Sequence, residues 1–179
     1  SFRVTTGNAS DGTSKMQATN VGTTRYVTYQ MPATETSYRA RFSFNPNGVT
    51  GNNVAREVFR GLNGNATVFS IWVRRQCATP NCTTGNTYQV GATVNRAGGS
   101  TQTNWFTIPT TGYTAIEFAW NSGNPATFSL STGGVVRQTL NGLNTSASTL
   151  TSVQFGPRGD TFGSTWYFDN FVSARRILP

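Results

Sequence analysis

The chain has 179 residues and a net charge of +8, and 36% of its residues are hydrophobic, 12% aromatic and 11% charged. No apolar run approaches the roughly 20 residues of a membrane-spanning helix, so we expect no membrane insertion. The length of the chain is that of one domain, which we expect to span residues 1–179. The absence of histidine excludes the usual general base and any nucleophilic centre that pairs serine or cysteine with histidine.

The N-terminal region contains a segment, residues 7–24, that is rich in glycine, serine, threonine and asparagine. This composition is typical of a surface loop, or of an arm that docks on a neighbouring subunit. The first residue is Ser1 instead of methionine, which fits a chain whose secretory signal has been removed. We therefore expect a secreted, extracellular or cell-surface protein.

Alternating apolar and polar residues predict strands along the rest of the chain. Turn-forming residues separate the predicted strands, which span 37–44, 56–62, 67–75, 87–94, 104–108, 113–120, 126–131, 135–140, 150–156 and 166–172. No stretch has the pattern of a crossover helix. The sequence therefore predicts an all-β, two-sheet antiparallel jelly roll or β-sandwich of about ten to thirteen strands, with little or no helix.

Two cysteines, Cys77 and Cys82, lie between two of these predicted strands. A disulfide between them would close the tip of a hairpin and would indicate an oxidising compartment. The alternatives fit less well, because a zinc site needs further cysteine or histidine ligands and a redox motif needs a tighter spacing.

The C-terminal half contains strand sequences that together resemble a known fold. They are the pair 128–131 and 135–140, the strand 153–156 and the closing sequence 166–173, which reads Trp-Tyr-Phe-Asp-Asn-Phe-Val-Ser. In these features the chain resembles the concanavalin A-like lectin and glucanase superfamily, in particular the laminin-G-like jelly rolls of secreted bacterial proteins. The resemblance implies a curved sheet whose concave face meets carbohydrate, and a last strand that pairs with one from the N-terminal region.

The basic residues suggest the chemistry of a partner. All fourteen except Lys15 are arginines, whose planar guanidinium group binds carboxylate, sulfate or phosphate through two hydrogen bonds and stacks on aromatic rings. We therefore expect a glycan, in particular an anionic one, or another polyanion as the partner. Nucleic acid is not expected, because the arginines form no basic block.

The main hypothesis is thus a secreted, non-catalytic binding or adhesion module that recognises a glycan on one sheet face. Arg39 and Arg41 are candidate ligand-binding residues because they alternate with apolar residues along one predicted strand. Trp105, beside polar neighbours, and Tyr113 are candidate aromatic platforms for a sugar ring. An alternative hypothesis is a self-assembling subunit of an extracellular filament or surface layer, with the chain itself as partner.

A second alternative is a polysaccharide-degrading enzyme, although we expect no catalysis. Glycoside hydrolysis needs two carboxyl groups at a fixed separation, and the six acidic residues show no such spacing on a strand. A lyase could instead use tyrosine, arginine and an amide, for which Tyr38, Gln89, Arg39 and Arg41 are candidates. No cofactor is expected, and the one metal alternative is a single structural calcium ion at Asp160 or Asp169.

Overall fold

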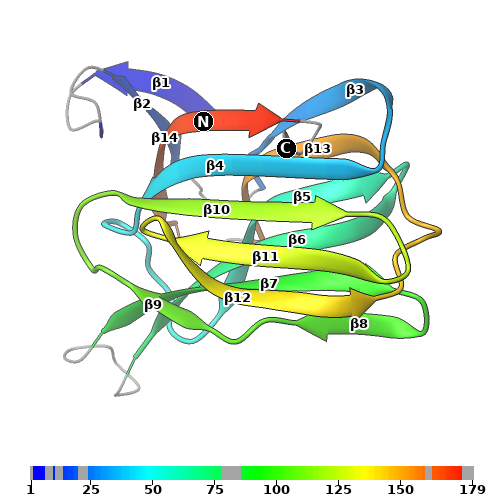
Figure 1. Cartoon of the computed structure of the whole chain (residues 1–179). Helices are drawn as coiled ribbons and strands as arrows, with labels where there is room; N and C mark the ends of the chain where they lie inside the picture. Colours follow the sequence, from blue (N-terminus) through cyan, green and yellow to red (C-terminus); the bar gives the residue numbers. More distant parts are fainter. Residues whose placement is uncertain are drawn as a thin grey trace.

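A computed structural model of the chain describes residues 2–6, 10, 14–19, 24–77, 86–159 and 163–174. The described residues form fourteen strands and no helix, so no helix among them could cross a membrane. The strands make two antiparallel sheets that lie face to face (Figure 1). The predicted all-β, two-sheet jelly roll is confirmed.

The first sheet contains seven strands. Their spatial order is β1 (Phe2–Thr6), β2 (Ser14–Thr19), β14 (Thr165–Ala174), β4 (Ser37–Asn45), β10 (Thr114–Asn121), β11 (Ala126–Thr132) and β12 (Val135–Leu143).

The second sheet has the order β3 (Val27–Glu35), β13 (Leu150–Arg158), β5 (Ala55–Asn63), β6 (Ala66–Gln76), β7 (Thr87–Arg96) and β8 (Gly99–Gln102). A further short strand, β9 (Phe106–Ile108), also pairs with β7. In Figure 1, strands β4, β10, β11 and β12 of the first sheet lie in front of β5, β6 and β7.

The N-terminal region differs from the sequence prediction. Residues 14–19 are not part of a loop or arm, because they form β2, which lies between β1 and β14 inside the first sheet. Most of the remaining residues between 7 and 24 lie outside the described residues. The last strand pairs with an N-terminal strand as expected, since Trp166 of β14 lies opposite Ala18 of β2.

Aromatic rings from both sheets fill the space between them. The ring of Phe118 in β10 lies 4.8 Å from that of Phe59 and 5.4 Å from that of Phe69, both in the second sheet. Phe155 and Phe168 make a similar contact across the sheets at 4.9 Å. These five side chains are almost completely buried. The alternation predicted for β4 and β10 is confirmed, because each apolar residue of the predicted pattern points into this layer.

Tyr38 of β4 gives this core a measurable pH dependence. Its side chain is 1% exposed, and burial raises its pKa from 10.0 to about 12. The unfolded chain would therefore lose this proton at a lower pH than the folded chain. The stabilisation is fully present below pH 10 and is lost as the pH rises towards 12.

We expect the free energy of unfolding of the wild type to fall between pH 10 and pH 12 more than that of Tyr38→Phe. The difference should be about 2–3 kcal/mol, as two pKa units correspond to that energy. Urea unfolding at several pH values measures it. An identical pH dependence in the two proteins would contradict the burial of this hydroxyl.

Candidate functional site

The outer face of the second sheet carries the candidate site. Its side chains form rows, because residues on neighbouring strands lie directly opposite one another. One row crosses six strands and consists of Thr28, Gln154, Arg60, Ser70, Thr93 and Gln102. The next two rows consist of Arg158, Glu57, Trp72 and Gly91, and of Ala55, Arg74, Gln89 and Thr107. We call these three rows, together with the adjoining Trp105, the polar face.

Strand geometry explains why these side chains share one face. Successive side chains of a strand point to opposite sides, so packing one set into the core directs the other set outward. In β6 the buried Phe69, Ile71 and Val73 alternate with Ser70, Trp72 and Arg74. The alternation in β7 is the same, with Val90, Ala92 and Val94 buried against the first sheet.

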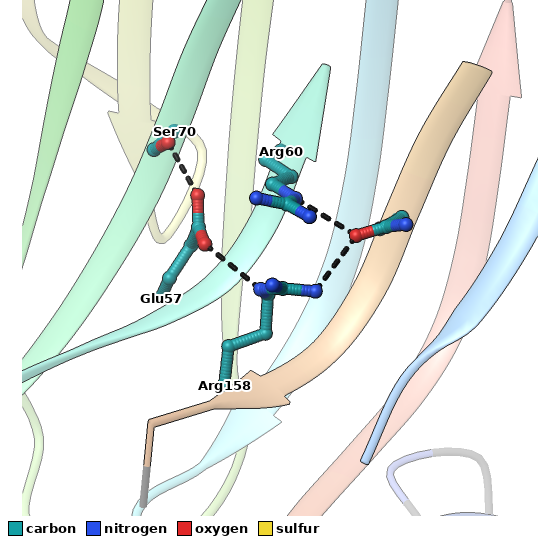
Figure 2. A network of polar contacts seen from close by, with 5 residues as sticks. Glu57, Arg60, Ser70 and Arg158 are labelled. Carbon is teal, nitrogen blue, oxygen red and sulfur yellow. Dashed lines mark hydrogen bonds and ion pairs between the residues drawn. The ribbon is translucent and has the colours of Figure 1, made fainter. Parts of the chain in front are cut away.

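Two arginines converge at one end of the polar face. Arg60 Nε and Arg158 Nη1 donate hydrogen bonds to the same oxygen, Gln154 Oε1, at 2.8 and 2.9 Å. Figure 2 shows the two guanidinium groups side by side. Burial lowers the pKa of Arg60, and the positive charge of Arg158 lowers it further. The protein thus holds two like charges close together in a partly desolvated place.

Glu57 lies beside this pair and compensates it in part. Its Oε2 lies 3.2 Å from Arg158 Nε, while its Oε1 accepts a hydrogen bond from the hydroxyl of Ser70 (Figure 2). The side chains of Glu57 and Ser70 are almost fully buried. Glu57 is the single carboxylate on the polar face among the described residues, against the three arginines 60, 74 and 158. The described part of the polar face therefore remains positive.

An aromatic platform adjoins the middle of the polar face. The guanidinium carbon of Arg74 lies 4.2 Å from the centre of the Trp105 ring, which is a cation–π contact. Arg74 Nε also donates to Gln89 Oε1 at 2.8 Å, which fixes the guanidinium group. The ring also lies against Gly91, where an added Cβ would be 3.2 Å from ring carbons. A hollow of about 210 Å³ beside Trp105 is lined in addition by Trp72, Thr93 and Gln102.

The four binding residues predicted from the sequence do not form one site. Trp105 belongs to the polar face, together with Gln89, whereas Arg39 and Arg41 project from β4 on the outer side of the first sheet. Arg39 Nε donates to Glu117 Oε1 at 2.8 Å, so this arginine is already paired with a carboxylate.

The two candidate tyrosines lie in different surroundings, and the role of Tyr113 as a sugar platform stays a prediction. Tyr113 precedes β10, and its hydroxyl is buried with no hydrogen-bond partner among the described residues. Burial raises its pKa to about 12, and the nearby Asp169 and Tyr167 act in the same direction. Tyr38, a candidate for lyase chemistry, lies in the core and cannot act beside Arg39 and Arg41 at the surface.

Sequence reasoning missed Arg60, Arg158 and Gln154. The simple alternation breaks in both strands that carry them, because a register shift lies between Glu57 and Phe59 and another between Phe155 and Arg158. Arg74 had a visible signal, since it follows Ser70 and Trp72 at intervals of two in a strongly alternating strand.

The metal and disulfide predictions remain open. Asp160 and Cys82 lie outside the described residues, so the calcium ion and the Cys77–Cys82 bond stay predictions. Asp169 is buried, and its Oδ2 accepts hydrogen bonds from the backbone N–H and the hydroxyl of Ser10, at 2.7 and 3.0 Å. Within the described ranges no three histidine, cysteine or acidic side chains gather as metal ligands would. Asp169 has a structural role, because it ties Ser10 to β14.

Comparison with known proteins identifies the architecture. No protein-family model matches the chain, and no curated protein is detectably similar in sequence. The fold is similar to that of an endo-β-1,4-glucuronan lyase from the fungus Trichoderma reesei, with a TM-score of 0.64, 13% identity and coverage of 98% of this chain and 90% of the lyase.

Two other solved structures are also similar. The globular domain of T. cruzi calreticulin has a TM-score of 0.66 and 10% identity, over 99% of this chain and 80% of that one. A mutant alginate lyase in complex with an alginate trisaccharide has a TM-score of 0.61 and 11% identity, over 91% of this chain and 82% of the lyase. At these identities the similarities show the jelly-roll sandwich and support the expected concanavalin A-like fold.

The contact between Gly91 and Trp105 gives a direct test of the platform. In Gly91→Ala the new methyl group would press on the ring, so we expect Trp105 to move and its stack with Arg74 to loosen. Tryptophan emission should shift to longer wavelength and become more sensitive to acrylamide quenching. The same substitution in a Trp105→Phe background is the control. A spectral change that persists in that background would contradict the assignment.

Proposed function

We propose that the protein binds an acidic polysaccharide across the polar face of the second sheet. The observation that carries the proposal is the pair Arg60 and Arg158, which share one acceptor on Gln154. Holding two guanidinium groups together is unfavourable unless an anion compensates them. Among the described residues Glu57 forms an ion pair with Arg158, and its charge acts on Arg60 from farther away. A ligand carboxylate would complete the charge balance, because guanidinium groups bind carboxylates with two parallel hydrogen bonds.

The rest of the polar face suits a sugar polymer better than a small anion. Gln89, Gln102 and Thr93 offer donors and acceptors for hydroxyl groups. Trp105 is half-buried, and the part of its ring that Arg74 and Gly91 leave uncovered offers an apolar surface for a pyranose. Because neighbouring strands lie about 4.8 Å apart, six strands extend over roughly 24 Å, which is room for several sugar units. The polar face therefore has the length and chemistry for an extended acidic glycan.

Two of the structural neighbours agree with this proposal. They are lyases of glucuronan and alginate, and the second was solved with an alginate trisaccharide. A glycan partner would fit an extracellular location, as the sequence predicts. Self-assembly into a filament or surface layer stays a prediction, which light scattering of the purified protein can test.

A second candidate function is polysaccharide cleavage by β-elimination. The ring of Tyr26 lies 4.6 Å from the guanidinium carbon of Arg158, so a tyrosine, two arginines and the Gln154 amide lie close together. In such a reaction a base takes the proton at C5 of a uronate, a C4–C5 double bond forms and the C4–O bond breaks. The leaving oxygen then takes a proton. Hydrolysis by paired carboxylates fits less well, since Glu57 has no carboxylate partner on the described part of the polar face.

We expect Arg60→Ala and Arg158→Ala each to weaken binding of oligogalacturonate or alginate oligosaccharides at least tenfold, which isothermal titration calorimetry would measure. Each variant loses a charge-assisted hydrogen bond worth about 1.5–3 kcal/mol. Affinity should fall as sodium chloride is added, and neutral oligosaccharides should not bind. Arg41→Ala is the matched control, because Arg41 is an exposed arginine of the first sheet. Binding that survives in both variants but disappears in Arg41→Ala would refute the proposed site.

Incubation with glucuronan or alginate separates binding from cleavage. We expect the wild type to bind without forming an unsaturated product, whose double bond absorbs in the ultraviolet. Product formation that is lost in Tyr26→Phe, while binding is kept, would establish the lyase instead.

A further inference from the structure

A second cavity, of about 330 Å³, lies between the two sheets at one edge of the sandwich. It opens where β3 and β13 of the second sheet face β2, β4 and β14 of the first. The residues that line it are Met16, Val27, Thr28, Tyr29, Tyr38, Val153, Phe155, Phe171 and Ser173. None of these side chains is charged. Val153 and Phe155 point away from the polar face, whose Gln154 lies between them in β13. The cavity meets the polar face at Thr28, the residue that ends its first row.

An irregularity in β14 forms one wall of the cavity. The pairing of β14 with β4 shifts between Asp169 and Val172, and Asn170 adopts a left-handed conformation with φ of 49°. This bulge places the ring of Phe171 on that of Phe155, with a centroid distance of 4.9 Å. Phe171 nevertheless remains 37% exposed. The aromatic wall is therefore accessible from outside.

The mouth of the cavity is also apolar. Val27 is 47% exposed and Tyr29 is 51% exposed, and both belong to the edge strand β3. Exposed apolar residues that adjoin a concave aromatic wall are typical of a ligand site.

The lining carries four hydroxyl groups, and that of Tyr38 is the one on a buried side chain. Tyr38 is 1% exposed, and its hydroxyl has no partner in hydrogen-bonding geometry among the described residues. Burial raises the pKa of Tyr38, while a hydrogen-bond interaction of poorer geometry with the Ser173 side chain on the same wall lowers it. A tyrosine hydroxyl can both donate and accept hydrogen bonds, so a ligand oxygen beside Tyr38 would supply a partner in addition to Ser173.

We propose that this cavity binds a small uncharged molecule with a flat apolar body and one oxygen that hydrogen-bonds to Tyr38. The volume is near the lower end of the roughly 300–1,000 Å³ that small-molecule sites span, which suits a single-ring compound and excludes a polysaccharide chain. The ring would stack on Phe171, and the described lining residues carry no charge that would favour an ion. Among the described residues this site shares Thr28 with the edge of the polar face but none of its arginines, so either site could exist without the other.

The probes for this proposal are 4-methylphenol and toluene, which differ in one hydroxyl group. Saturation-transfer NMR and titration of amide resonances should detect saturable binding of both, with 4-methylphenol binding more tightly. Tyr38→Phe should weaken 4-methylphenol about three- to tenfold, the effect of one net hydrogen bond, and leave toluene unchanged.

Val27→Trp provides a second test that does not alter the core. The larger ring would fill the mouth of the cavity, and we expect it to abolish binding of both probes. Val135→Trp is the matched control, since Val135 is a 55% exposed valine at the far edge of the first sheet. This variant should bind both probes as the wild type does. Absence of saturable binding to the wild type, or binding that persists in Val27→Trp, would overturn the proposal.

Discussion

Phe59, Phe69 and Phe155 of the second sheet pack against Phe118 and Phe168 of the first, with ring centres 4.8 to 5.4 Å apart across the sheets. Each aromatic contact of this kind fixes the side of a strand that faces inward. Because side chains alternate along a strand, it also fixes which residues face outward. The polar face is thus a consequence of the core.

The bulges in β5 and β13 modify this constraint at one place. Without the register shifts beside Glu57 and Arg158, simple alternation would separate residues that the structure brings together. The result is a cluster of two arginines, one glutamate and one glutamine, in which the described residues do not fully compensate the positive charge. Charged groups with shifted pKa values often gather at functional sites, and structural ion-pair networks produce such shifts as well.

Strands with strong alternation could be predicted from the sequence, and β4, β7 and β10 match their predicted ranges to within two residues. Strands β1, β2, β3 and β8 were missed. Most residues of β3 and β8 remain exposed, so burial leaves no clear pattern of period two in their sequences. The alternation along β4 correctly predicted that Arg39 and Arg41 face outward. The pairing of Arg39 with Glu117 could not be foreseen, because these residues lie 78 positions apart.

The central claim is that an acidic glycan contacts the arginines of the second sheet. NMR of the arginine side chains during titration with an alginate oligosaccharide tests it most directly, because each Nε–H group gives its own resonance. The account predicts that the signals of Arg60, Arg74 and Arg158 shift together and saturate, while those of Arg39 and Arg41 stay in place. Shifts confined to Arg39 and Arg41 would move the site to the first sheet and contradict the account.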